Sequence, residues 1–105
     1  MNIKQGMLLP IIGNGEVLVK YNGNGKVNLT IAIEGDIHEI IISKQAIDEL
    51  LSDTNFSVHR FDSSHPMNCI IHWPWKNQLW LTVSTKDDCL IRVISCKEFR
   101  EIVYA

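Results

Sequence analysis

Hydrophobic and polar side chains alternate along most of this chain, and a period of two is typical of β-strands with one buried face. The clearest run is Lys26–Glu34, in which every second residue is aliphatic. The Gly35–Asp36 turn signal separates it from Ile37–Ile42, which continues the alternation. Two Gly-Asn-Gly signals, at residues 13–15 and 23–25, each precede a β-rich run, and the second is typical of a hairpin loop. The first half of the chain therefore predicts a three-stranded meander.

The second half of the chain predicts four more strands. They are Phe56–Phe61, Asn68–Trp73, Gln78–Ser84 and Asp88–Ile94, and the segments between them are polar or contain proline, as turns commonly do. One further strand is expected near Ile3–Leu9, before the first meander. No linker-like stretch divides the chain, so we expect one domain over residues 1–105.

Two segments carry helical signals. Ser43 can cap a helix near residues 44–52, whose apolar residues recur at helical spacing. Ser95 and Glu98 fit a capping box that opens a short C-terminal helix near residues 96–102. The predicted class is α+β: mainly antiparallel β, with about seven or eight strands in two meanders that form a sandwich or a half-barrel.

The second meander is apolar on both faces in the register that we predict for it. A four-residue turn pairs Trp73 with Gln78 and Ile71 with Trp80. One face then holds Leu79, Leu81, Val83, Cys89, Ile91 and Val93. The other holds Ile71, Trp73, Trp80, Leu90 and Ile94, with Arg92 beside Trp80. Both faces need cover: the core covers one, and a helix, a second sheet or another protein covers the other. A turn one residue shorter would swap the assignments of the first strand.

Size and charge narrow the class of protein. The chain has 105 residues, of which 46% are hydrophobic and 21% charged, and its formal net charge is −2. Its basic residues are scattered singly, whereas nucleic-acid binders usually carry a basic excess. The N-terminal apolar run at residues 7–12 is too short for a signal peptide or a membrane span. We therefore expect a cytoplasmic protein with neither nucleic acid nor membrane as its partner.

The histidines and cysteines do not have the spacing of a metal or catalytic site. The four histidines are isolated, and strand alternation points Cys69 and His72 to opposite faces. The three cysteines suit buried thiols in a reducing compartment. The Gly-Asn-Gly signals precede β-rich runs, whereas a phosphate loop needs a helix after its glycines. We expect no catalytic residue, no metal and no cofactor.

Trp73, Trp75 and Trp80 gather on and beside one predicted hairpin. They can fill the core, since aromatic residues bury large areas. They can also form a binding surface, because Trp and Arg are enriched among the residues that dominate protein interfaces. Trp75 lies in the predicted turn and is then the most exposed. This interpretation makes Trp75, Trp80 and Arg92 candidate partner-binding residues.

A small antiparallel domain with short loops and no cofactor motif resembles in type the immunity proteins that bacteria keep against the toxins of competing cells, such as those of contact-dependent growth inhibition systems. The resemblance rests on no specific motif, so no residue's role is transferred. It implies tight one-to-one binding over the active site of a toxin, often a nuclease with a basic surface, which a slightly acidic domain suits. Acidic residues in predicted loops are then candidate contacts: Asp36, Asp53, Asp62, Asp87 and Asp88.

Three alternatives stay open. The chain is also similar in type to phage-encoded inhibitors of bacterial defence proteins. It could instead be a self-associating structural domain, a homodimer through the Trp-bearing face. The last alternative is an enzyme or ligand-binding protein with a pocket between sheet and helix, and with His59, His65 or Cys69 at its mouth.

Overall fold

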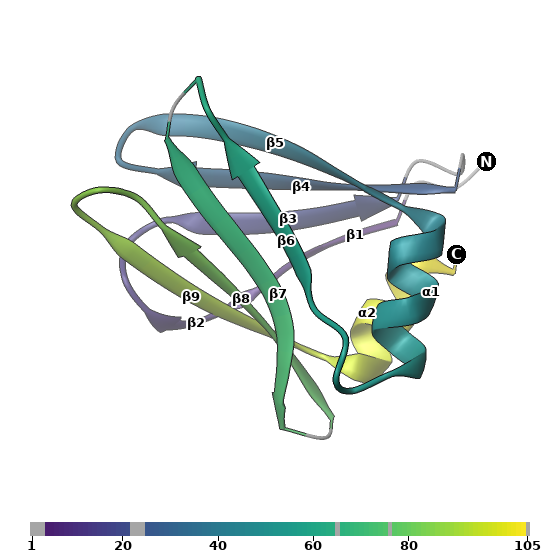
Figure 1. Ribbon diagram of the computed structural model, residues 1–105. Helices are drawn as coiled ribbons and strands as arrows, with labels where there is room; N and C mark the ends of the chain where they lie inside the picture. Colours follow the sequence, from purple (N-terminus) through teal and green to yellow (C-terminus); the bar gives the residue numbers. More distant parts are fainter. Residues whose placement is uncertain (1–3, 22–24, 65, 76, 105) are drawn as a thin grey trace.

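Two antiparallel sheets pack against each other in the computed structural model, and two helices close one end of the space between them (Figure 1). The structure describes residues 4–21, 25–64, 66–75 and 77–104, and only the backbone of Lys4 and Trp75. The four-stranded sheet has the order β1 (Lys4–Met7), β3 (Glu16–Tyr21), β4 (Lys26–Ile33), β5 (Asp36–Ser43). The five-stranded sheet has the order β2 (Leu9–Ile12), β9 (Cys89–Ser95), β8 (Gln78–Ser84), β7 (Met67–Trp75), β6 (Val58–Asp62).

The hydrophobic core lies between the two sheets. Alternation turns one face of each sheet inward, and the aliphatic side chains on those faces, such as Leu29 and Leu81, are buried. The helices α1 (Lys44–Ser52) and α2 (Cys96–Val103) turn their apolar stripes toward the same core. Because neither helix is long enough to be stable alone, packing on the core must hold both in place.

Both helices begin where the sequence predicts. The hydroxyl of Ser43 accepts a hydrogen bond from the backbone N–H of Ala46 at 3.2 Å, and that of Ser95 accepts one from Glu98 N–H at 3.1 Å. Each cap satisfies a backbone donor that the first helical turn leaves without a partner. The predicted α+β class, with its two antiparallel meanders, is confirmed, and the sheets form a sandwich of nine strands within the described residues.

The N-terminal segment departs from the prediction of a single strand near Ile3–Leu9. The described part of it forms two short strands, because the chain crosses from one sheet to the other at Leu8. Leu8 is buried, and its N–H donates to the carbonyl of Val17 at 3.0 Å. Pro10 is tolerated in β2 because that strand is the edge of its sheet. Ile3 itself lies outside the described residues.

The predicted register of the second meander is wrong at its first hairpin. Gln78 lies opposite Trp75 rather than Trp73, and Ile71 lies opposite Leu81 rather than Trp80. Two differences cause this shift: the turn holds two residues, 76–77, and a β-bulge interrupts the pairing between residues 72 and 75. A bulge adds a residue to one strand only, so a simple period of two cannot reveal it.

The second hairpin of this meander is also shifted. Its turn holds four residues, 85–88, so that Val83 lies opposite Leu90, and Arg92 lies opposite Leu81 on the inner face. Trp80 lies opposite Val93 on the outer face, and the predicted placement of Arg92 beside Trp80 on one face is therefore wrong. The inner face of the meander holds Ile71, Leu79, Leu81, Val83, Leu90, Arg92 and Ile94.

Candidate functional site

The outer face of the five-stranded sheet combines apolar side chains with polar ones that are not acidic, Lys or Arg. The strand register places the following residues on it, which we call the uncharged face: Leu9, Ile12, His59, Phe61, Asn68, Ile70, His72, Gln78, Trp80, Thr82, Ser84, Cys89, Ile91 and Val93. None of them is Asp, Glu, Lys or Arg. Leu9 is 64% exposed and Phe61 61% exposed, so the apolar surface faces solvent at both sheet edges.

The outer face of the four-stranded sheet has a different composition. Its register positions include Glu16, Lys20, Lys26 and Glu39, all with charged side chains. Charged residues alternating with buried aliphatic ones are typical of a sheet with one solvated face. This face also exposes Met7, Ile37 and Ile41, so the two sheets differ in the charge of their outer faces and not in having exposed apolar residues.

At the centre of the uncharged face, neighbouring side chains pack against one another and shield each other from solvent. Val93 is only 9% exposed because it lies between its cross-strand neighbours Trp80 and Leu9. The hydroxyl of Thr82 lies 3.5 Å from Nε2 of His72. Toward the β6 edge the surface is hollowed by a depression of about 350 Å³, whose lining includes Phe61 and Ile70 and also the charged residue Arg60. This face thus combines aliphatic and aromatic side chains with polar groups.

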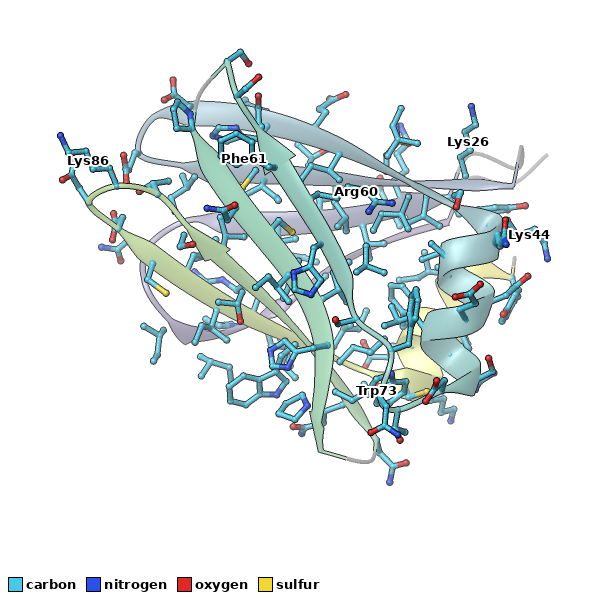
Figure 2. All side chains as sticks on the ribbon, in the orientation of Figure 1. Lys26, Lys44, Arg60, Phe61, Trp73 and Lys86 are labelled. Atoms are coloured by element: carbon cyan, nitrogen blue, oxygen red, sulfur yellow. The ribbon has the colours of Figure 1, made fainter. Side chains whose placement is uncertain are left out.

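The end of the sandwich opposite the helices is acidic. Three turns meet there around a pocket of about 280 Å³, which is lined by Ile33, Glu34, Asp36, His38, Ser64, Pro66, Thr85 and Lys86. Five carboxylates belong to these turns, and we call them the acidic end: Glu34, Asp36, Asp62, Asp87 and Asp88. Lys86, at the tip farthest from the helices (Figure 2), is the only Lys or Arg in the three turns.

Side-chain hydrogen bonds join the three turns to one another. Nδ1 of His38 on β5 lies 2.9 Å from Oδ2 of Asp62 on β6 and so connects the two sheets. The other carboxylate oxygen of Asp62 accepts from the Ser64 hydroxyl at 2.7 Å. The hydroxyl of Thr85 donates to the carboxylate of Glu34, which connects the sheets a second time. The acidic end is therefore held in a defined arrangement, even though its residues come from turns.

Of the predicted acidic contacts, Asp36, Asp62, Asp87 and Asp88 are brought together at the acidic end. Asp53 is not: it follows α1 at the opposite end of the molecule. Asp62 is half-buried and already bonded to His38, so Asp36, Asp87 and Asp88 are the exposed members. The sequence could not reveal this grouping because the residues come from three different turns.

Arg92 is a structural residue. It is 4% exposed, and its guanidinium donates to the carbonyls of Ile12, Gly13 and Gly15 at 2.8, 2.9 and 2.6 Å. The guanidinium also donates to a fourth carbonyl, that of Ile91 on its own strand, at 2.9 Å. These bonds fix the segment between β2 and β3 onto β9, and they leave Arg92 buried away from any partner.

The three tryptophans do not form one surface. Trp73 is half-buried beside the helices (Figure 2), where its Nε1–H donates to the carbonyl of Leu50 at 2.7 Å. Trp80 lies on the uncharged face, with Nε1 at 3.4 Å from the side-chain oxygen of Gln78. The side chain of Trp75 lies outside the described part of the chain. Trp73 therefore packs against the helix end of the core, whereas Trp80 lies on the outer face of its sheet, and a binding role for Trp80 stays a prediction.

The sequence analysis missed several members of these surfaces. Leu9 and Phe61 end predicted strands that were given no face, and Ile12 lies outside every predicted strand. The run Leu-Pro-Ile-Ile at residues 9–12 is the available signal for an exposed apolar edge. Glu34 and His38 were missed because no local pattern sets them apart. The pairing of His38 with Asp62 spans two sheets, and it follows from the tertiary structure alone.

Of the residues named for a ligand pocket, His59 and Cys69 both line the depression at the β6 edge, which lies on the outer side of the five-stranded sheet and not between sheet and helix. Cys69 points into the core, and burial raises the pKa of its thiol to about 12, which makes it a poor nucleophile. His59 is exposed on the uncharged face and bonds to the Ser57 hydroxyl at 2.8 Å. His65 lies outside the described residues. Within the described part of the chain, no group of three or more His, Cys, Asp or Glu side chains is arranged to hold a metal ion.

Comparisons by sequence and by structure find no matching family model, curated protein or solved structure. Among the described residues, neither helix has the length and apolar character that a membrane span requires.

Proposed function

We propose that this chain acts by binding, as an immunity or inhibitor protein that neutralises a toxin through one-to-one contact, and that its acidic end makes this contact. The partner we propose is a protein with a basic surface, such as a nuclease domain whose substrate is a polyanion. The observation that carries the proposal is the grouping of Asp36, Asp62, Asp87 and Asp88 with Glu34 at one end of the molecule.

The charge of this end supports a basic partner. Five carboxylates stand against one Lys in the three turns, so this end is more acidic than the chain as a whole, whose net charge is −2. A concentrated field of one sign speeds the encounter with a partner of opposite sign. It also disfavours acidic partners, which would be repelled.

The rigidity of this end supports tight binding. The bond between His38 and Asp62 and the bond between Thr85 and Glu34 hold three turns together before any partner arrives. Within the β8–β9 turn, the backbone N–H of Asp88 donates to the Thr85 hydroxyl at 3.0 Å. A preorganised surface loses less conformational entropy on binding, and more of the interaction energy then appears as affinity.

The test is affinity capture from the native host with three forms of the full chain. The first is the wild type, and the second carries Asp36→Lys, Asp87→Lys and Asp88→Lys, which reverse the exposed charges of the acidic end. The third is a matched control that carries Glu49→Lys, Asp53→Lys and Glu101→Lys, three exposed acidic residues at the helix end. Captured proteins are identified and purified, and their affinity is then measured by calorimetry.

We expect the wild type and the control to capture the same basic protein in a one-to-one ratio, and the acidic-end variant to lose it. For a toxin, co-expression with the wild type restores growth of the producing cell. A captured defence protein would instead identify the chain as an inhibitor of the phage-encoded type. Capture of no stoichiometric partner, or equal capture by all three forms, would refute the proposal.

A further inference from the structure

We infer that the uncharged face is a homodimer interface, on which a second copy of this chain packs sheet against sheet. This inference concerns a different surface from the acidic end and does not depend on the proposed function. It assigns an occupant to the sheet face on which Leu9, Ile12 and Phe61 are exposed to solvent.

The rest of the described chain does not cover this face. The apolar stripes of α1 and α2 are buried in the core between the sheets, with Leu50 and Phe99 among the residues they contribute. Val93 is the one buried aliphatic residue of the sheet that lies outside that core, because its neighbours on the outer face shield it. At the sheet edges Leu9, Ile12 and Phe61 are all more than half exposed.

The area of the face is sufficient for a dimer. Five strands spaced about 4.8 Å apart and four to nine residues long cover a footprint of roughly 500 Å². Two copies would therefore bury about 1,000 Å² together, which is the lower limit expected of a biological protein–protein interface. The largest apolar patch of an ordinary monomer is about 300–600 Å² and is often itself functional.

The chemistry of the face fits a second copy better than a basic partner. A twofold dimer places one surface against itself, so every charge on it would approach an identical charge. No register position of the uncharged face holds Asp, Glu, Lys or Arg, so this conflict does not arise at those positions, and Arg60 lines only the depression at the β6 edge. A basic surface docked here would instead lose its hydration without gaining an ionic partner. The outer face of the other sheet, with Glu16 and Lys26, lacks this self-compatibility.

The position of the acidic end constrains the arrangement. Two copies packed with their strands running the same way along the interface would bring ten carboxylates of two acidic ends to one side, where they repel. The reversed arrangement places the acidic ends at opposite ends of the dimer. Each copy then keeps its acidic end accessible.

The test compares one substitution at equivalent positions of the two sheets. Thr82 is half-buried at the centre of the uncharged face, and Thr30 is half-buried on a central strand of the other sheet, also facing outward. Sedimentation equilibrium of the full chain measures the dimer dissociation constant for the wild type, Thr82→Arg and Thr30→Arg. In Thr82→Arg, a twofold dimer brings two guanidinium groups together with no carboxylate to pair with either. The dimer dissociation constant should therefore rise at least about tenfold. We expect Thr30→Arg to match the wild type.

A second pair of variants covers the case in which Thr82→Arg does not fold, as judged by circular dichroism. Phe61 is 61% exposed on the uncharged face and Ile41 is 55% exposed on the other sheet, so both tolerate a surface substitution. Phe61→Lys should weaken the dimer, and Ile41→Lys should leave it unchanged. A wild type that stays monomeric at high micromolar concentration overturns the inference. The inference is also overturned if both variants of a pair fold and both raise the dimer dissociation constant equally.

Discussion

At the scale of single residues, burial decides the chemistry of the polar and ionisable groups. The thiol of Cys69 lies in the core between the sheets, whereas that of Cys89 is exposed at the start of β9. Desolvation favours the neutral form of a buried thiol, which is why the pKa of Cys69 rises from 9.0 to about 12. The nearby positive charge of Arg60 opposes this shift only in part.

Cys69 should therefore make stability depend on pH in the alkaline range. A raised pKa in the folded state means that the contribution is fully present below pH 9 and is lost as pH rises toward 12. Relative to Cys69→Ala, the wild type should lose about 2 kcal/mol of unfolding free energy between pH 8 and pH 10.5. Urea denaturation at several pH values measures this difference, and Cys89→Ala serves as the control for removing a thiol outside the core. A wild-type advantage that stays constant up to pH 10.5 would contradict the assignment.

At the scale of elements, one buried side chain holds a segment that has little hydrogen bonding of its own. The guanidinium of Arg92 donates to carbonyls of Ile12, Gly13 and Gly15, where the chain passes from the five-stranded sheet to the four-stranded one. Carbonyl groups buried without a donor are costly. Arg92 thereby supplies hydrogen-bond donors that the backbone N–H groups of a neighbouring strand would supply in a regular sheet.

We predict that Arg92→Met lowers the unfolding free energy by about 2–4 kcal/mol, because several acceptors lose their donor at once. The matched control is Arg100→Met, since Arg100 is exposed and donates to a single backbone carbonyl, that of Leu51, at 3.0 Å. We expect the control to cost less than about 1 kcal/mol. Urea denaturation of both variants provides the comparison, and equal losses would show that Arg92 is not specifically required.

The elements themselves were largely predictable. The strands from Lys26 to Ser43, the helix after Ser43 and the helix after Ser95 follow from alternation, turn residues and caps, all of which act over a few residues. The strand register of the second meander was not predictable, because it depends on a bulge before Trp75 and on a turn of four residues after Ser84. Those features have no period, and a shift of one residue exchanges the two faces of a strand.

At the scale of the whole molecule, the two proposed surfaces should differ in their response to salt. Binding at the acidic end rests on charge, and added salt screens exposed charges over distances beyond about 8–10 Å. Contact between two uncharged faces rests on apolar burial, which salt does not screen. The two surfaces can therefore be separated by solution conditions as well as by mutation.

We predict that raising the ionic strength from about 0.05 M to about 0.5 M weakens partner binding at least tenfold and leaves the dimer unchanged or slightly tighter. Calorimetry with the purified partner measures the first quantity, and sedimentation equilibrium measures the second. As a cross-check, Thr82→Arg should still bind the partner with unchanged affinity per chain. Loss of the dimer at high salt, or salt-independent partner binding, would show that the surfaces are assigned wrongly.

The sequence by itself determined the α+β class, the two meanders, the helix positions and the acidic turn residues, because each depends on neighbours in the chain. Only the tertiary structure decided which side of each strand faces outward and which turns meet. It placed Arg92 inside, left Trp80 outside, and joined His38 to Asp62 across two sheets. The physical reason is that alternation identifies a strand with one apolar face, whereas pairing register and sheet packing, which involve residues far apart in the sequence, decide what that face contacts.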